Sequence, residues 1–332
     1  MKDTTIVDYV SQEQEAIEKS VSLLLNNEIV ALPTETVYGL FANALSPEAV
    51  AKIFVAKWRP ADNPLIVHVR DSSQIKSLVR SLLPVEELLI ERCMPGPFTL
   101  VLPKADHVPS ITVWWLDTIC VRISDHPVMK KILSDTDLVL AGPSANRSGK
   151  PSPTTAQMVS NDMQGRIDLI IDGGICDIGI ESTVVRVIDN IVRILRPGLI
   201  SREDIQDIVG SEYTVIYADQ GINESPGSRY RHYAPEVAVS FFDKFTFCDL
   251  AEKKIALIVT DEWLEEYQYI LSGSEQILSL WSRDYLTQAA ARLYQYLWQV
   301  DNLGIDHVLV EVLPEEGIGY AIMNRMRKVV SS

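Results

Sequence analysis

The stretch LPTETVYGLFANALSPEAVAKIFVAKWRPADNPLIVHV (32–69) decides the fold of the first part of the chain. It begins at the end of an apolar run, 29–32, that is typical of a buried strand. A turn crowded with hydroxyl groups follows at once and contains Thr34 and Thr36. Hydroxyl donors at the end of a strand suit the binding of a small polar ligand.

The same stretch continues with a helix, two cations and a second apolar strand. Ser46 and Pro47 predict the helix start, because Ser is a favoured N-cap and Pro fits the first helical position. Lys57 and Arg59 follow the helix, and His68 lies in the next strand. The two cations could bind a polyanion, or they could solvate the C-terminal end of the helix, where cations are favoured. His68 could equally be an ordinary core or surface residue.

The bulk properties of the chain describe an acidic globular protein. Its 332 residues suffice for two domains or one large one, and 47% of them are hydrophobic. The net charge of −15 argues against general coating of nucleic acid but is compatible with a local basic pocket for an anion. The four cysteines lack CxxC spacing, and we find neither a signal pattern nor an apolar run of ~18–20 residues. We therefore expect a cytoplasmic protein without structural zinc, disulfides or a membrane span.

Local patterns predict further elements of the first part. A helix is expected over 11–28, with a capping box that begins at Ser11. The run ICVRIS predicts a strand in which Arg122 interrupts an apolar sequence; this side chain could serve a site or point to solvent. A hairpin should turn at Asp189 and Asn190.

The chain changes character after residue 209. Residues 210–236 are rich in turn-forming residues and predict a linker. Strand and helix patterns then alternate over 237–332, which predicts a small parallel α/β domain of Rossmann-like type. It lacks GxGxxG, so a dinucleotide site is not supported. We expect a catalytic domain at 1–209, a linker at 210–236 and a C-terminal domain at 237–332.

Polar residues recur in four loops, 33–39, 57–63, 142–152 and 179–183. Ligands gather at strand ends in open α/β sheets, so these loops could meet in one crevice, although a segment such as SANRSG could also be a plain turn. The chain contains no GxxxxGK[ST], GxSxG or HExxH motif. Without an obvious nucleophile or metal motif, catalysis by positioning and electrostatics is the better hypothesis.

A set of segments, taken in order, resembles the Sua5/YrdC family of threonylcarbamoyl-AMP synthases. The matching segments are PTETVYGL (33–40), KIFVAKWRPADNPLIVHV (52–69), PGPFTLVL (95–102), VRISDHP (121–127), PSANRSGKPSPT (143–154), IDGG (171–174), GIESTVVRV (179–187), LRPG (195–198) and SPGSRYRHYAP (225–235). The resemblance implies a YrdC-like domain with a twisted mixed sheet and helices, followed by a smaller Rossmann-like α/β domain.

The resemblance also implies an activity. The family joins L-threonine, bicarbonate and ATP, with Mg²⁺, into L-threonylcarbamoyladenylate, and releases pyrophosphate and water, so its members are nucleotidyltransferases. A separate tRNA threonylcarbamoyl-transferase complex then uses the product to make t6A at adenosine 37 of ANN-decoding tRNAs. Direct binding of nucleic acid by this acidic chain is not expected.

The site residues implied by the resemblance fall into three sets. Its KxR signature, expected to be catalytic, falls on Lys57 and Arg59. The residues expected to bind threonine are Thr34, Thr36, His68, Arg122 and Ser182. The residues expected to bind the nucleotide are Lys57, Arg59, Asn63, Thr118, Ser144, Asn146, Ser152 and Arg196, together with Tyr230 and His232 of a linker that would close over the pocket.

Two other functions fit parts of the sequence. One is a YrdC-like module that binds RNA without catalysis, and the other is a carbamoyltransferase built on the same fold. The chain also departs from the family pattern by added bulk at Phe41, Trp58, Met94, Trp114 and Trp115. These substitutions remove no expected polar contact, so they bear on the shape of the pocket.

Overall fold

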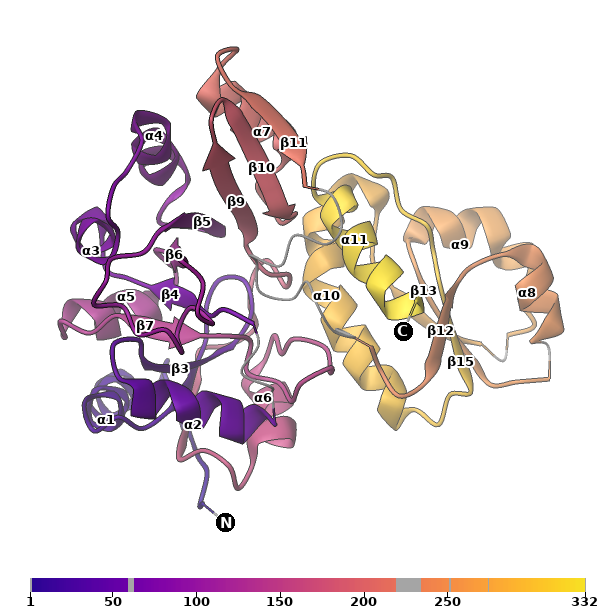
Figure 1. The fold of residues 1–332 in the computed structure, drawn as a ribbon. Helices are drawn as coiled ribbons and strands as arrows, with labels where there is room; N and C mark the ends of the chain where they lie inside the picture. The colour runs from indigo at the N-terminus through magenta and orange to yellow at the C-terminus, as the bar shows by residue number, and fades with distance from the viewer. Residues whose placement is uncertain (1, 59–62, 219–233, 251, 274, 332) are drawn as a thin grey trace.

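The computed structural model describes residues 2–58, 63–218, 234–250, 252–273 and 275–331, which form two α/β domains side by side (Figure 1). Within these residues, a mixed sheet has the strand order β1-β8-β2-β3-β7-β4-β6-β5-β9-β10-β11. A second sheet, with the order β12-β15-β13-β14, is parallel throughout. Both sheet types agree with the predicted fold class.

The first domain contains these elements in chain order: β1 (Thr5–Asp8), α1 (Glu13–Leu25), β2 (Val30–Leu32), β3 (Gly39–Asn43), α2 (Pro47–Lys57), β4 (Ile66–His68), α3 (Ser72–Leu78), α4 (Pro84–Cys93), β5 (Phe98–Pro103), β6 (Thr118–Arg122), α5 (Pro127–Ser134), β7 (Leu140–Gly142), α6 (Ala156–Met163), β8 (Leu169–Asp172), β9 (Thr183–Ile188), β10 (Ile191–Arg196), α7 (Arg202–Val209) and β11 (Thr214–Tyr217). The second domain contains β12 (Ala238–Phe241), α8 (Lys244–Asp249), β13 (Ile255–Val259), α9 (Asp261–Tyr267), β14 (Gln276–Ser279), α10 (Leu286–Gln299), β15 (His307–Val310) and α11 (Ile318–Val330), with short 3-10 turns between some of them.

The central strands β2, β3, β4 and β7 of the large sheet are buried on both faces, to which alternate residues of a strand point in turn. In β2, Val30 and Leu32 pack with side chains of α1 and α5. Ile29 and Ala31, which alternate with them, join a larger core that includes Val50 and other residues of α2. The first domain is therefore layered, with helices on either side of a central sheet.

The starts of α2 and α1 show one case in which the local sequence predicted the helix cap and one in which it did not. Ser46 accepts a hydrogen bond from the Ala49 amide at 3.3 Å, and Pro47 opens α2, as predicted. The predicted capping box at Ser11 is wrong, because its hydroxyl donates to Asp8 at 2.6 Å and α1 begins at Glu13 without a side-chain cap. A nearer acceptor on the preceding strand competes successfully for the serine.

The chain beyond residue 209 differs from a plain linker in one respect. Residues 214–217 form β11, which pairs in parallel with β10 and extends the large sheet. Alternating strands and helices then build the second domain as predicted, with α8 as an unpredicted addition. In Figure 1, α10 and α11 lie on the side of this domain that faces the first domain.

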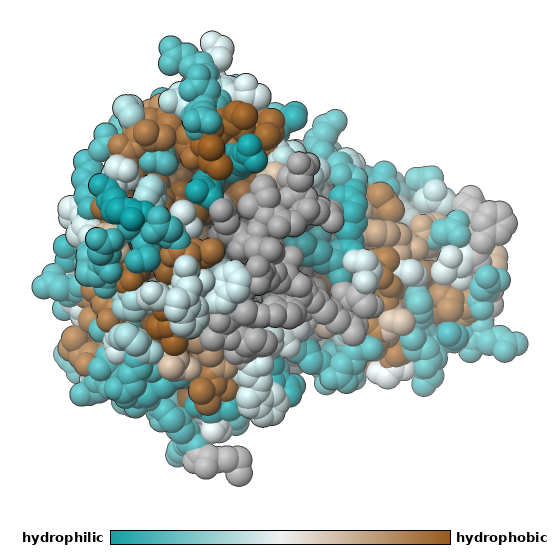
Figure 2. All heavy atoms as spheres, viewed as in Figure 1, coloured by the Kyte–Doolittle hydropathy of each residue, from teal (hydrophilic) through white to brown (hydrophobic). Residues whose placement is uncertain are grey.

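On the face of the molecule drawn in Figure 2, hydrophilic residues surround separate hydrophobic patches on both domains. Across the described residues, no helix is both long enough and apolar enough to cross a membrane.

Candidate active site

A polar pocket of the first domain lies over one face of the large sheet. Phe41 of β3, His68 of β4, Arg122 of β6 and Gly142 of β7 line it together, and residues from three loops surround them. As predicted, residues of three of the four polar loops, 33–39, 142–152 and 179–183, line one pocket. β4 and β6 run parallel and place His68 and Arg122, the last residue of each strand, side by side, whereas β3 and β7 run antiparallel to their neighbours.

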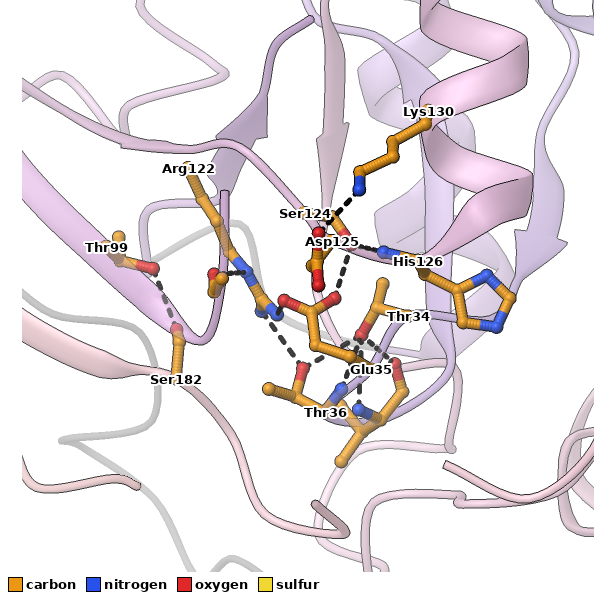
Figure 3. Close-up of polar contacts among 12 residues, drawn as sticks. Thr34, Glu35, Thr36, Thr99, Arg122, Ser124, Asp125, His126, Lys130 and Ser182 are labelled. Carbon is orange, nitrogen blue, oxygen red and sulfur yellow. Dashed lines mark hydrogen bonds and ion pairs between the residues drawn. The ribbon is translucent and has the colours of Figure 1, made fainter. Parts of the chain in front are cut away.

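A buried ion pair lies beside this pocket (Figure 3). Arg122 donates from Nη2 to Oε1 of Glu35 at 2.6 Å and from Nη1 to the Thr36 hydroxyl at 3.0 Å. Its Nε donates to the Gly96 carbonyl, and Ser124 donates to the other carboxylate oxygen of Glu35. These contacts hold the guanidinium rigidly while using only part of its donor fork, which leaves room for a second carboxylate.

The protonation state of this pair follows from its surroundings. Burial alone would raise the pKa of Glu35, but the charge of Arg122 and hydrogen bonds from Ser124 and Arg122 outweigh it and hold the pKa at about 2. Arg122 is only 3% exposed. The sequence left open whether this side chain points to solvent, and the structure shows that it points inward.

The turn between β2 and β3 presents hydroxyl groups next to the arginine. The Thr34 hydroxyl bonds to the Thr36 hydroxyl at 2.8 Å and to the Val37 carbonyl at 2.7 Å. The amide of Val37 donates back to the Thr34 hydroxyl. These local bonds fix the turn, so that the polar groups of Thr36 and Arg122 reach the pocket in one orientation.

His68 is neutral in this environment. Burial and the nearby charge of Arg122 together lower its pKa to about 3, against the opposing effect of Glu35. The ring of Phe41 packs edge-on against it, with 4.9 Å between centroids. Among the described residues, no hydrogen-bond partner satisfies its Nδ1 atom. A buried polar atom of this kind is a candidate contact for a ligand hydroxyl.

Lys57 fixes the loop after β7 through hydrogen bonds to its backbone. Its ammonium donates to the backbone carbonyls of Ser144 and Asn146 and is 2% exposed. The Asn146 amide spans the same loop by donating to the carbonyls of Arg147 and Lys150, both at 2.7 Å. Lys57 is thus not a solvating charge at a helix end; it shapes a loop whose side chains border the pocket.

The opposite wall is built from the loop before β9 and the end of β10. Arg196 donates from Nε to the Ser182 carbonyl and from Nη2 to the Ser182 hydroxyl, both at 3.0 Å. The Ser182 hydroxyl also bonds to Thr99 at 2.7 Å. Next to Ser182, the Glu181 carboxylate accepts a hydrogen bond from Ser152 at 2.6 Å.

The structure brings most of the predicted site residues together. Those that line the pocket are Thr34, Thr36, His68, Arg122, Ser144, Asn146, Ser152 and Arg196. Ser182 and Lys57 contact pocket-lining residues. Asn63 is buried, and Thr118 lies at the start of β6; neither borders the described part of the pocket. Arg59, Tyr230 and His232 lie outside the described residues.

Two carboxylates of the site, Glu35 and Glu181, were not predicted. Each is a buried acid beside hydroxyl residues, in the sequences TET and EST. A single charged residue inside an otherwise uncharged segment could have indicated each of these carboxylates. The sequence does not show which residues pair with them, because those partners are distant in the chain. Where the described residues are concerned, no group of three His, Cys, Asp or Glu side chains could hold a metal ion.

Of the bulky departures from the family pattern, Phe41 is the one that borders the pocket. Its ring lies so close to Gly39 and Gly142 that a Cβ at either position would come within 2.5 Å of it. Trp58 is instead 68% exposed, and the guanidinium of Arg166 lies 3.5 Å from its ring centroid. The added bulk at Phe41 is therefore accommodated by two neighbouring glycines.

Two family models match this chain. A model for the Sua5, YciO and YrdC proteins, described as telomere recombination, matches residues 22–198. A second, described as the C-terminal domain of threonylcarbamoyl-AMP synthase, matches residues 200–331.

Individual relatives match over nearly the whole chain. Threonylcarbamoyl-AMP synthase of Bacillus subtilis is 38% identical over 97% of this chain and 95% of its own length. The enzyme of that name from Pyrococcus abyssi is 39% identical over 95% and 94%. The crystal structure of P. abyssi Sua5 complexed with L-threonine superposes with a TM-score of 0.87 and 34% identity, covering 99% of this chain and 98% of that one.

Proposed function

The chain belongs to the threonylcarbamoyl-AMP synthase family, and from that premise we propose that it makes L-threonylcarbamoyladenylate from L-threonine, bicarbonate and ATP. The observation that carries the proposal is the composition of one pocket. Residues expected to bind an amino acid and residues expected to bind a nucleotide line it together. Two ligands held side by side can react without a protein nucleophile.

The threonine end of the pocket would be built around Arg122. Its guanidinium is fixed by Glu35 and Thr36, and its unused donors suit the carboxylate of an amino acid. His68 is neutral, so its unpartnered Nδ1 can accept a hydrogen bond from the threonine hydroxyl. A complex with L-threonine is known for the similar protein from P. abyssi.

The reaction then needs two steps that gather negative charge. The neutral amine of threonine attacks bicarbonate, and loss of water leaves a carbamate. An oxygen of this carbamate attacks the α-phosphorus of ATP; a new O–P bond forms, the bond to the β-phosphate oxygen breaks, and pyrophosphate leaves with the electron pair. Cations nearby favour the neutral amine in the first step and offset the developing charge in the second.

The nucleotide end would be formed by Ser144, Asn146, Ser152 and Arg196. Arg196 supplies a fixed positive charge at the pocket wall. Lys57 acts on this end by holding the carbonyls of the loop that carries Ser144 and Asn146. Mg²⁺ enters this scheme as part of the substrate MgATP. The chain would thus act as a nucleotidyltransferase, whose product a separate complex transfers to tRNA.

Pyrophosphate release by the purified chain tests this proposal. With ATP present, we expect release only when both threonine and bicarbonate are added. Release that does not depend on threonine would count against it. The alternative of RNA binding without catalysis predicts salt-sensitive affinity for RNA and no turnover of ATP.

A further inference from the structure

Two side chains of the C-terminal domain contact one carboxylate in the wall of the pocket, that of Glu181. Glu181, which lines the pocket, accepts a hydrogen bond from the Tyr294 hydroxyl of α10 at 3.1 Å. Arg325 of α11 donates to the same oxygen from Nη2 at 3.2 Å. In Figure 1, both helices lie on the side of their domain that faces the first domain. A residue of the pocket thus depends on partners more than one hundred positions away in the chain.

The contact between the domains is tightly packed around this carboxylate. Ile178 and Ile180 belong to the hydrophobic core of the C-terminal domain, together with the pocket residue Val37. Gly179, between the two isoleucines, approaches α10 so closely that a Cβ there would lie 2.2 Å from the Cα of Ala291. The loop that carries Glu181 is therefore held against α10 by backbone contact.

Glu181 connects these partners to several groups of the pocket. On the pocket side, its Oε1 accepts the hydrogen bond from Ser152. Arg325 donates as well to the Pro197 carbonyl and to the Glu181 carbonyl, next to Arg196 and Ser182. The C-terminal domain therefore makes two kinds of contact with the pocket. Arg325 binds the Glu181 carboxylate, which accepts the hydrogen bond from Ser152, and it also binds backbone carbonyls adjacent to Arg196 and Ser182.

The charge of Glu181 explains why these partners matter. Burial alone would raise the pKa of this carboxyl, but the charges of Arg325 and Arg196 outweigh it and lower the pKa. Removal of Arg325 would leave a buried carboxylate with less compensation, facing the place expected for a polyanion. Such a change acts on the pocket even when both domains stay folded.

We propose that Arg325 and Tyr294 of the C-terminal domain are positioning residues for the nucleotide end of the pocket, acting through Glu181 on Ser152 and on the Arg196–Ser182 pair. Neither side chain borders the described pocket, so they act through other residues. The inference deepens the proposed function, on which it rests for the identity of the nucleotide. The contacts themselves do not depend on the reaction.

The test uses the full chain and a nonhydrolysable ATP analogue, measured by calorimetry beside threonine binding and pyrophosphate release. Arg325→Met should weaken the affinity for the analogue by about tenfold or more, with a smaller effect on threonine. Arg327→Met is the matched control, because Arg327 lies on the same helix and pairs with Glu315 at the surface. It should change neither affinity.

Tyr294→Phe covers the case in which Arg325→Met does not fold. It removes one hydrogen bond to Glu181 and should weaken analogue binding by roughly threefold to tenfold. Tyr296→Phe on the same helix is its control, since the Tyr296 hydroxyl donates to the Ser279 carbonyl within the C-terminal domain.

A rescue experiment separates positioning from general stability. In Glu181→Gln/Arg325→Met the uncompensated carboxylate is absent, so analogue affinity should recover relative to Arg325→Met alone. A folded Arg325→Met chain with wild-type affinities and KM for ATP would overturn the inference, as would loss of affinity without recovery in the double variant. Failure of the proposed function would differ, because the wild-type chain itself would then release no pyrophosphate.

Discussion

Arg122→Met should damage both threonine binding and stability, because Arg122 serves two carboxylates. One is Glu35, which is 8% exposed and already paired with it. The other is the carboxylate expected on threonine. The variant removes the charge but keeps most of the apolar volume of the side chain, so that the cavity left behind is small.

The loss of stability in Arg122→Met can be calculated from the pKa of Glu35. Its pKa is about 2 in the folded chain, against an ordinary value of 4.5. At ~1.4 kcal/mol per pH unit, this difference corresponds to about 3 kcal/mol of stability at neutral pH. Loss of one partner of a buried ion pair costs about 3–5 kcal/mol in comparable cases, so the two estimates agree.

The sign of the pH dependence follows from the same shift. Since folding lowers the pKa of Glu35, the stabilisation is complete above 4.5 and is lost as the pH falls toward 2. In Arg122→Met, burial is no longer opposed by the arginine charge, so the pKa of Glu35 should rise instead. The difference in stability between wild type and variant should therefore shrink on acidification.

Urea unfolding near neutral pH and at acidic pH, together with calorimetry of threonine binding, measures both effects. Arg80→Met is the matched control, because the Arg80–Asp117 pair is exposed to solvent and should contribute little to stability. Glu35→Gln in the Arg122→Met background should restore part of the stability but not the binding. An Arg122→Met chain as stable as the control at neutral pH would refute the reasoning about the ion pair.

Two further substitutions and one NMR titration test other parts of the structure. Lys57→Met should weaken binding of an ATP analogue by roughly tenfold and leave threonine affinity nearly unchanged in calorimetry, because its ammonium holds the carbonyls of the 144–146 loop. Because the pKa of His68 is about 3, NMR should show a neutral ring throughout the range above pH 5, and threonine affinity should not titrate with this residue. Gly179→Ala should lower the free energy of unfolding by about 3 kcal/mol or more in urea titrations, because its φ is +74° and the new methyl would meet α10.

Each of these has an outcome that would contradict it. Equal losses of nucleotide and threonine binding in Lys57→Met would show that the residue does not act on one loop. A His68 ring that titrates near pH 6 would mean that water reaches this side chain and that it is less buried than the structure shows. For Gly179, the control is Gly174→Ala, where φ is +87° but no atom lies within 4 Å of the new Cβ. Comparable losses at both positions would exclude the contact with α10 as the cause.

Features set by neighbouring residues could be predicted from the sequence. Ser46 and Pro47 start α2 because the cap and the first turn involve only adjacent positions. The alternating strands and helices of the C-terminal domain predicted its parallel sheet for the same reason. Ser11 shows the limit, because one competing acceptor at Asp8 was enough to displace the predicted cap.

Features set by distant residues could not be predicted. The pocket lies over one face of the large sheet because the strand order places β3, β7, β4 and β6 side by side. No local sequence pattern predicts that order. Glu35 and Glu181 were missed because their partners, Arg122 and Arg325, are 87 and 144 positions away. Most of the expected ligand residues do line one pocket, but their roles rest on the family resemblance and stay predictions.

The most direct test of the central claim follows the carbon of bicarbonate. The purified chain is incubated with MgATP, L-threonine and ¹³C-bicarbonate, and the products are analysed by mass spectrometry. We expect an adenylate that contains threonine and one labelled carbon, formed together with an equal amount of pyrophosphate. Pyrophosphate release that yields threonyl-adenylate without the label, or no adenylate at all, would contradict the account.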